Sequence, residues 1–376
     1  MHRIPRRRLL KCSLGAAIAS AWCSSSRAWQ PFRAADPDAF AVSFPSMGST
    51  IDVRWVAEGT KGDPESVLKR LQEVADMWVD VLSDYQQDSQ CMAFCRQADG
   101  LDWVEPPAPL WRMIVECDRW HRLSEGAFDA ALGALTRLRR KERPGTESEW
   151  QSARERCGWE LLEIDTEGHR VRFERSGVRL DFGAIGKGFV IDRLGEALRA
   201  MGIERFVANA SGNMLCGEPV GREDRPVFAQ RDAALETQER PEWHPDSGWP
   251  VAIGRINDPE QEMRRMKLAR CGISTSGDQF QKFRDRPGDA PQQRTSHIVD
   301  PIQRRGLDRA CMASVITNSA ADADALSTAG CVHLQRGSMH AWLERNADAL
   351  PMAEWNLQSQ PDRSSPIRWT SVYCDW

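Results

Sequence analysis

The segment Asp181-Phe182-Gly183-Ala184-Ile185-Gly186-Lys187-Gly188 has the composition of a phosphate-binding turn and precedes a predicted helix. Glycines let the backbone approach a ligand closely, and the N–H groups that begin a helix attract phosphate. Lys187 adds a positive charge beside them. The segment differs from a Walker A loop, because Gly188 stands where that loop carries a magnesium-binding Ser or Thr. Taken alone, the stretch fits a phosphate site and an ordinary glycine-rich turn equally well.

A second candidate is the pair Asp324 and Thr328, which are four residues apart within a predicted helix. Side chains at this spacing lie on one face of a helix. A carboxylate and a hydroxyl there could bind Mg²⁺, which takes oxygen ligands and keeps some of its waters. Such pairs are common, so a solvated Asp and a Thr that bonds within its own helix is the stronger local interpretation.

Two further segments carry groups with possible chemical roles. His297 precedes an Asp300-Pro301 turn and could be a general base, a phosphate contact or a buried histidine with satisfied hydrogen bonds. Residues 273–278 are small and polar, which predicts a turn that either cradles an anion or only redirects the chain.

The spacing of hydrophobic residues predicts the elements that must position these groups. Helices are expected at 64–82, 110–123, 147–157, 188–201 and 319–331, and strands at 161–164, 171–173, 178–180, 206–208, 214–216 and 251–253. Residues 39–56 are predicted to form two strand pieces joined by a tight glycine turn. We expect polar loops at 221–248 and 284–294, and little regular structure beyond Pro351. Short strands mixed with helices of unequal length favour the α+β class.

Charge is distributed unevenly along the 376 residues. The formal net charge is −4, but residues 1–28 carry +6 and no acid, so the remainder is −10. A net-acidic body gives no electrostatic reason to expect nucleic-acid binding. Beyond residue 28 no apolar stretch is long enough to span a bilayer. Most of the cysteines are scattered, and their spacing assigns neither a disulfide nor a zinc site.

Residues 1–28 have the order of an export signal. A basic segment with Arg6-Arg7 precedes a short apolar segment, and Ser26-Arg27-Ala28 offers small residues for cleavage. The twin arginines resemble a twin-arginine signal, which implies a periplasmic protein, possibly associated with the membrane. The alternative is a disordered basic tail.

Eight blocks, in order, resemble the ApbE-type FAD:protein FMN transferases, and the resemblance runs from about residue 44 to 334. They are Met47–Thr50, Leu82–Ser89, Gly126–Asp129, Asp181–Asp192, Asn209–Asn213, Thr275–Asp278, His297–Pro301 and Ala323–Thr328. The resemblance predicts one ApbE-like domain at 39–345, followed by a C-terminal tail at 346–376. It also implies mixed and antiparallel sheets with flanking helices and an FAD cleft between lobes.

Members of this family cleave FAD with Mg²⁺, attach FMN to a threonine of an acceptor flavoprotein and release AMP. The resemblance implies FAD contacts at Met47, Tyr85, Ala127, Phe128, Asp129, Lys187, Ser276, Gly277, His297 and Val299. It implies metal ligands at the Ala184 carbonyl, Asp324 and Thr328, and catalytic roles for His297, Asp324 and Lys187. His297 would help to deprotonate the incoming threonine.

The sequence departs from the family pattern at three places. Ser49 is inserted into the usual Met-Gly-Thr, and Ser211 and Asn213 replace a Gly and an Asp in the usual Gly-Gly-Asp turn. An insertion around 236–246 has no assigned counterpart. Two alternatives stay open: an FAD pyrophosphatase that yields free FMN and AMP, which resembles a side activity of some relatives, and a non-catalytic FAD-binding carrier or maturation partner, which the altered turn at 211–213 suggests.

Overall fold

An antiparallel sheet forms the centre of the molecule. The computed structural model describes residues 39–56, 63–141, 145–219, 248–256, 258–277, 282–283, 295–350, 353–360 and 368–374. Within these residues one sheet has eight strands, and each pairs antiparallel with its neighbours. In sheet order they are β1 (Ala39–Ser46), β2 (Ser49–Val56), β5 (Phe206–Ala210), β6 (Asn213–Cys216), β9 (Cys271–Gly277), β14 (Ala310–Thr317), β15 (Ala353–Gln360) and β16 (Arg368–Cys374).

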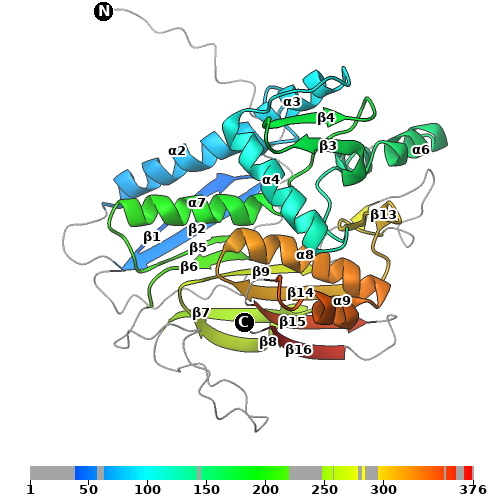
Figure 1. Cartoon of the computed structure of the whole chain (residues 1–376). Coiled ribbons are helices and arrows are strands. Elements are labelled where there is room, and N and C mark those ends of the chain that lie inside the picture. Colours follow the sequence, from blue (N-terminus) through cyan, green and yellow to red (C-terminus); the bar gives the residue numbers. More distant parts are fainter. Residues whose placement is uncertain are drawn as a thin grey trace, which may run out of the picture.

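Helices cover one face of this sheet (Figure 1). They are α2 (Pro64–Leu82) against β1, α7 (Gly186–Ala200) against β5 and β6, and α8 (Ala320–Arg336) against β9 and β14. The ends of α2 and α8 follow from local sequence. Asp63 accepts a hydrogen bond from the Ser66 N–H to begin α2, and Gly337, with φ of 70°, ends α8. The α+β class with antiparallel sheets and flanking helices is therefore confirmed.

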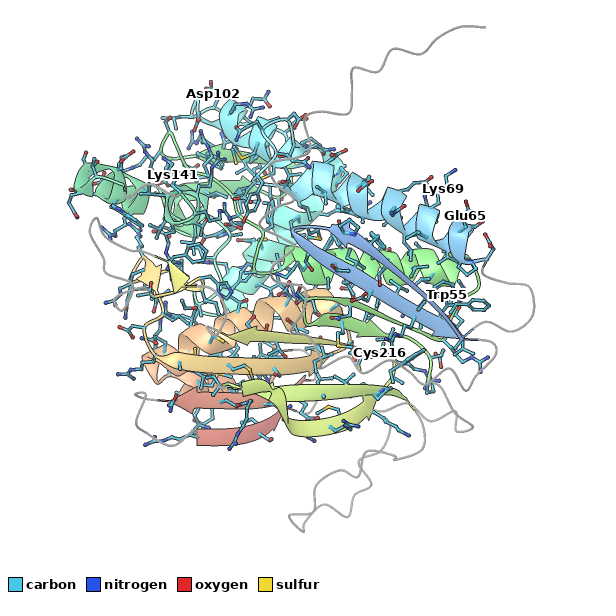
Figure 2. All side chains as sticks on the ribbon, turned by 180° about the vertical axis from the view of Figure 1, so that it is seen from behind. Trp55, Glu65, Lys69, Asp102, Lys141 and Cys216 are labelled. Carbon is cyan, nitrogen blue, oxygen red and sulfur yellow. The ribbon has the colours of Figure 1, made fainter. Side chains whose placement is uncertain are left out.

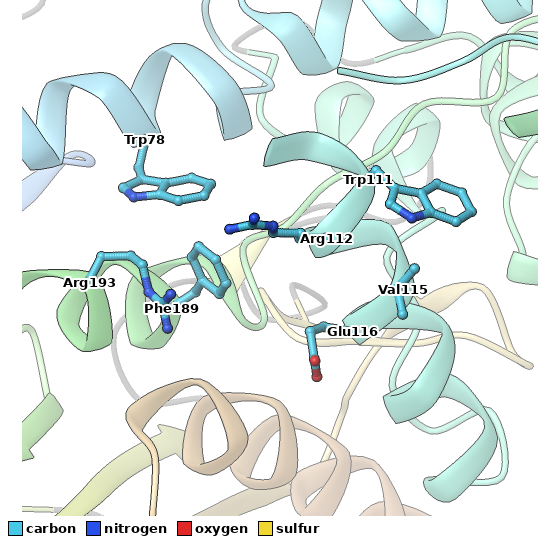
Figure 3. Close-up of a pocket in the computed structure, with 7 residues that line it drawn as sticks. All are labelled: Trp78, Trp111, Arg112, Val115, Glu116, Phe189 and Arg193. Carbon is cyan, nitrogen blue, oxygen red and sulfur yellow. The ribbon is translucent and has the colours of Figure 1, made fainter. Parts of the chain in front are cut away.

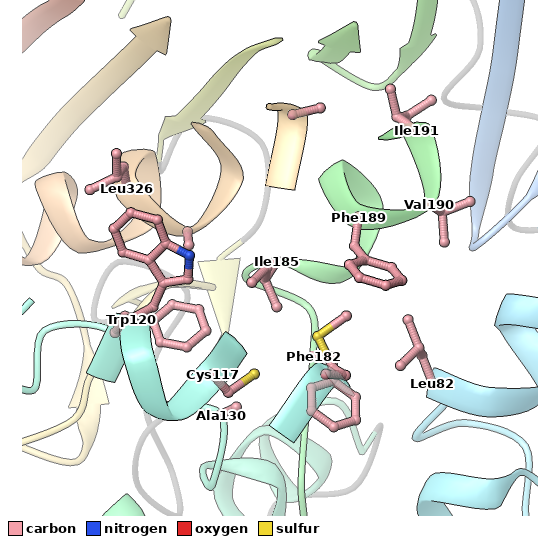
Figure 4. Close-up of a cluster of buried hydrophobic side chains, with 14 of the residues drawn as sticks. Leu82, Cys117, Trp120, Ala130, Phe182, Ile185, Phe189, Val190, Ile191 and Leu326 are labelled. Carbon is pink, nitrogen blue, oxygen red and sulfur yellow. The ribbon is translucent and has the colours of Figure 1, made fainter. Parts of the chain in front are cut away.

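The main core lies where α2, α7 and α8 meet α4 (Ala108–Leu123). Figure 4 shows Leu82, Trp120, Phe182 and Leu326 converging there, and all four are buried. Apolar residues recur every three or four positions on these helices, so one face of each is removed from water. The outer face of α2 stays polar, as the exposed Glu65 and Lys69 show in Figure 2.

A hairpin of β7 (Trp249–Arg255) and β8 (Asp258–Leu268) covers the other face of the sheet (Figure 1). Trp249, Val251 and Met266 from this hairpin form a second core with Met214 and Met312 of the sheet. The sheet is therefore buried on both faces along β6, β9 and β14, which explains why these strands do not alternate between apolar and polar residues.

The remaining elements surround this body. They are α3 (Gln90–Ala98), α5 (Gly133–Arg139), α6 (Glu147–Glu155), the 3₁₀ turn Trp159–Leu161, β3 (Leu162–Asp165), β4 (Arg170–Phe173), β10 (Lys282–Phe283), β11 (Thr295–Ser296), β12 (Val299–Asp300), β13 (Arg305–Gly306) and α9 (Met339–Asn346). The predicted helices and most of the predicted strands correspond to these elements within a few residues.

Three expectations about elements are wrong. Residues 178–180 form no strand; instead the Arg179 carbonyl accepts the Gly133 N–H and the Asp181 N–H donates to Ala130. The expected small-residue turn at 273–278 is strand β9 as far as Gly277. The segment beyond Pro351 was expected to have little regular structure, but β15 and β16 join the central sheet.

The C-terminal strands escaped prediction because β15 buries polar side chains. Glu354, Asn356 and Gln358 are buried, and Arg264 of β8 donates to both Glu354 and Asn356. Buried polar groups satisfied by a distant strand leave no local apolar pattern. The expected export signal at 1–28, the loops at 221–247 and 284–294, the insertion at 236–246 and Asp278 lie outside the described residues. Among the residues described, no helix is long and apolar enough to cross a membrane.

Candidate functional site

The start of α7 meets the first turns of α8 at very close range. The Gly188 N–H donates a hydrogen bond of 3.0 Å to Oδ2 of Asp324, which is 3% exposed. A Cβ at position 188 would lie 2.1 Å from the Ala320 carbonyl oxygen, so this approach requires glycine. In a continuous helix the Gly188 N–H would bond to the Ala184 carbonyl four residues earlier, and here it donates to Asp324.

The charge of the Lys187 ammonium acts on this carboxylate through space. Burial raises the pKa of Asp324, and the charge of Lys187 together with the Gly188 N–H acts in the opposite direction. Lys187 Nζ also donates to the Gly183 carbonyl at 3.2 Å, which holds the side chain over the turn 183–185. The start of α7 therefore brings an ammonium near a buried carboxylate, two groups that a site for a phosphate and its cation would need.

Hydroxyl groups from β9 and α8 extend the cluster. Thr328 Oγ1 lies 3.1 Å from Ser276 Oγ, and Ser276 Oγ lies 2.8 Å from Ser327 Oγ. Ser274 Oγ lies 3.2 Å from Ser327 Oγ and donates to Asn213 Oδ1 at 2.7 Å. Asn213, which stands where the resembled family has an Asp, is thus a buried member of this network.

The donor set of this cluster suits a hard cation. Asp324 and Thr328 supply a carboxylate and a hydroxyl one turn apart on α8, and the Ala184 residue lies in the turn before α7. Among the described residues there is no group of three or more His, Cys, Asp or Glu that could hold a metal ion. A Mg²⁺ site with one carboxylate, one hydroxyl and one carbonyl does not need such a group, because waters and the phosphate oxygens of a substrate can supply the remaining ligands.

Tyr85 lies just after α2, and its side chain is fixed by an arginine. The Tyr85 residue is 72% exposed, and the Arg140 guanidinium lies 4.3 Å from its ring centroid and donates to its hydroxyl at 3.1 Å. Arg140 also forms ion pairs with Asp84 and with Asp181, the latter at 3.4 Å. Burial and the neighbouring Asp181 raise the pKa of Asp84 to about 6, although Arg140 opposes both effects.

Arg140, Asp84 and Asp181 were not assigned a role from the sequence. Arg140 follows α5 in a run of basic residues, and nothing local distinguishes it from a solvated arginine. The three side chains come from positions up to 97 apart, and only the fold brings them to Tyr85.

Met47 lies in the turn between β1 and β2. Met47 and Gly48 have φ of 52° and 69°, and Ser46 pairs with Ser49, which defines a two-residue hairpin turn of the predicted kind. The Met47 methyl group would lie 3.9 Å from a Cβ at Gly186, so its side chain covers the first turn of α7.

Ala127, Phe128 and Asp129 are placed in the core. All three are buried, and the Asp129 carboxylate accepts the N–H groups of Ala131 at 2.7 Å and Trp159 at 2.9 Å. Burial raises the pKa of Asp129 despite these two hydrogen bonds. These side chains therefore pack in the core and stabilise the chain segment that follows α4. Their contact with a flavin stays a prediction.

His297 and Val299 belong to the segment 295–300. His297 is exposed, and its carbonyl accepts a hydrogen bond of 3.1 Å from the buried Arg139, whereas Val299 is buried in β12. Arg336 at the end of α8 binds Asp300 through two hydrogen bonds of 2.6 and 2.9 Å. Arg336 thus fixes Asp300 at the end of α8, and Arg139 fixes the backbone of His297.

A separate hollow of about 320 Å³ lies between α2, α4 and α7. Figure 3 shows Arg112 reaching from α4 toward Trp78 and Phe189, with Arg193 beside them. None of the residues that line it is among the predicted site residues. The hollow is therefore not assigned to the site built by Lys187 and Asp324.

The chain resembles known proteins in sequence and in structure. The ApbE family model matches residues 47–351. A Vibrio cholerae protein named FAD:protein FMN transferase is 24% identical over 295 residues, which cover 76% of this chain and 79% of the relative. A Chlamydia muridarum protein of the same name is 26% identical over 270 residues, covering 69% and 74%.

Solved structures share the fold. The flavin transferase ApbE from Vibrio cholerae matches with a TM-score of 0.69 and 20% identity over 89% of this chain and 97% of that one. The apo form of the Pseudomonas stutzeri flavinyl transferase ApbE matches with a TM-score of 0.66 and 24% identity over 89% and 94%.

The fold and the names of the sequence relatives define the class: the chain is a transferase. It belongs to the ApbE family, because the family model covers most of its length.

Proposed function

We propose that this enzyme transfers FMN from FAD to a threonine hydroxyl of an acceptor flavoprotein, with Mg²⁺ as cofactor and AMP as the second product. The observation that carries the proposal is the joint placement of Lys187, Asp324 and Thr328 at the junction of α7, α8 and β9. The names of the sequence relatives support FAD as the substrate.

The proposed metal ligands are the Ala184 carbonyl, the Asp324 carboxylate and the Thr328 hydroxyl. Bound Mg²⁺ would neutralise phosphate charge and polarise the bond that breaks. The Lys187 ammonium would hold the pyrophosphate, whose leaving half gains negative charge as AMP departs. Asp324 must be ionised to bind a cation, and Lys187 favours that form although burial opposes it.

The flavin would bind between the turn after α2, which carries Tyr85, and the β1–β2 turn, which carries Met47. Tyr85 offers an exposed ring with one face already covered by Arg140, so the opposite face is available to the isoalloxazine. Met47 would contact the flavin above the start of α7, and Ser276 and Gly277 would line the cleft from β9. His297 would accept the proton of the threonine hydroxyl, because that hydroxyl is a poor nucleophile at neutral pH.

We further propose that the mature protein acts in the periplasm, at the membrane surface, after export through the twin-arginine-like segment 1–28. The order of basic, apolar and small residues in that segment supports this location.

The test is to incubate the purified protein with FAD, Mg²⁺ and a candidate acceptor, and to measure AMP together with covalent flavin on the acceptor. We expect both products from the wild type and neither from Asp324→Asn or Lys187→Met, with the circular dichroism spectrum of each variant unchanged. Free FMN without a labelled acceptor would indicate the pyrophosphatase instead. Tight FAD binding without turnover, unaffected by Asp324→Asn, would indicate the carrier.

A further inference from the structure

The two helices that carry the proposed site bind each other's N-terminal backbone through carboxylates. Asp324 of α8 accepts the Gly188 N–H at the start of α7. In return, Asp192 of α7 accepts the Ala320 N–H at 2.8 Å through Oδ1 and the Ala321 N–H at 2.9 Å through Oδ2. The two contacts are related by spacing. Asp192 lies four residues, or about one turn, after Gly188 on α7, and Asp324 lies four residues after Ala320 on α8.

Asp192 accepts backbone N–H groups at the start of α8 that the capping residue of this helix, Ser319, does not bind. Ser319 accepts the Asp322 N–H through its side chain and the Ala323 N–H through its carbonyl. The N–H groups of Ala320 and Ala321 would otherwise have no partner within the helix. Since the carboxylate that satisfies them belongs to α7, the start of α8 cannot shift along α7 without losing two charge-assisted hydrogen bonds.

We propose that Asp192 is a positioning residue for the metal site: it fixes the first turn of α8 against α7 and so holds Asp324 at the spacing from Lys187 and Ala184 that a divalent cation needs. This inference rests on the function proposed above. It goes beyond that function because Asp192 is not a proposed ligand: it lies on α7, about two turns beyond Ala184, and accepts the backbone N–H groups of Ala320 and Ala321, at the start of the helix turn that leads to Asp324. Groups that orient metal ligands without touching the metal commonly change its affinity by about 10- to 100-fold.

The experiment measures binding of Mn²⁺ alone by electron paramagnetic resonance, on the full chain, alongside the Mg²⁺ concentration that gives half-maximal AMP release. We expect Asp192→Asn to weaken Mn²⁺ binding by about 10-fold or more and to raise the half-saturating Mg²⁺ concentration to match. The KM for FAD measured at saturating Mg²⁺ should change much less.

Asp99→Asn is the matched control. Asp99 also accepts a backbone N–H, that of Gly177 at 2.7 Å, together with two hydrogen bonds from Arg179. Its loss should lower the melting temperature without changing Mn²⁺ affinity. Wild-type Mn²⁺ affinity in folded Asp192→Asn, or an equal loss of affinity in Asp99→Asn, would overturn the inference.

Asp324→Asn separates this inference from the proposed function. If Asp324→Asn abolishes Mn²⁺ binding and Asp192→Asn leaves it unchanged, the metal site stands and only the role of Asp192 is refuted. If Asp324→Asn binds Mn²⁺ normally, the proposed metal site fails and this inference fails with it. Should Asp192→Asn not fold, Asp192→Ser takes its place, because serine removes the carboxylate, and unchanged Mn²⁺ affinity in that folded variant counts against the inference.

Discussion

The hydroxyl oxygens of Ser49 and Ser211 lie 2.6 Å apart and join the β1–β2 turn to the β5–β6 turn. Both residues are departures from the pattern of the resembled family, and the structure shows that they contact each other. Ser211 has φ of 52°, a conformation that costs a non-glycine residue energy. Its hydrogen bond to Ser49 offsets part of that cost and fastens the turn that carries Met47.

Replacing Ser211 should separate these two contributions. Ser211→Ala keeps the unfavourable φ and loses the hydrogen bond, so we expect a loss of about 1 kcal/mol in the free energy of unfolding. Ser211→Gly loses the same bond but relieves about 1 kcal/mol of backbone strain, so it should stay near the wild type. Urea unfolding of both variants checks this, and an alanine variant as stable as the glycine variant would contradict it.

Gly188→Ala should damage both stability and turnover. The added Cβ would lie 2.1 Å from a backbone oxygen and 2.6 Å from the carbonyl carbon of Ala320, so α7 and α8 must separate. We expect a loss of at least about 1–3 kcal/mol in the free energy of unfolding, as for overpacked cores. AMP release should fall far more than in Gly100→Ala, a control whose Cβ would have no neighbour within 3.4 Å. Near-normal turnover in Gly188→Ala would show that this close approach is not needed.

Tyr85→Ala should weaken FAD binding, and Tyr85→Phe should retain most of it. The exposed face of the ring is the proposed stacking surface, and stacking of an aromatic ring system is worth about 1–3 kcal/mol, or roughly 5- to 150-fold in Kd. Fluorescence titration with FAD measures this. Trp103→Ala is the control, because Trp103 is an exposed ring beneath Arg170 and Arg172 in the same kind of contact. Equal losses in Tyr85→Ala and Trp103→Ala would refute specific stacking at Tyr85.

His333 should make the fold sensitive to acid. Its Nε2 lies 3.0 Å from the Ser124 carbonyl, which can only accept, so Nε2 carries the proton and Nδ1 accepts from Ser338. Burial lowers the pKa of His333 to about 4, whereas an unfolded histidine titrates near 6.5. Between these values the unfolded state binds more protons, so stability falls as the pH drops from about 6.5 to 4, by about 3 kcal/mol in total.

Chemical unfolding at several pH values tests this prediction. The stability advantage of the wild type over His333→Gln should shrink as the pH falls from 7 toward 4.5. His340→Gln serves as the control, because the His340 side chain is 86% exposed and pairs with Glu344 on its own helix. A constant difference between wild type and His333→Gln across this range would contradict the assignment.

The sequence predicted site residues where the residue types and spacing that indicate a site all lie within one short segment. The spacing of Asp324 and Thr328 on a helix, and the glycines around Lys187, were recognisable locally, and the structure brings these residues together. Neither Arg140 nor Asp192, which ends the block 181–192, could be assigned a role from the sequence, because their partners lie tens to more than a hundred residues away. Strand β15 was missed for the same reason, since its buried polar residues are satisfied by Arg264 and not by their neighbours in sequence.

The hairpin of β15 and β16 ties the end of the chain to the helix that carries Asp324. Trp355 of β15 is buried beneath α8, where it packs edge-on against Trp342 of α9. Strand β15 also pairs along β14, whose N–H and C=O groups would otherwise form an open edge that invites aggregation. Because α8 rests on a strand that follows it in the chain, a ribosome must synthesise past Gln360 before the centre formed by α7 and α8 can become rigid.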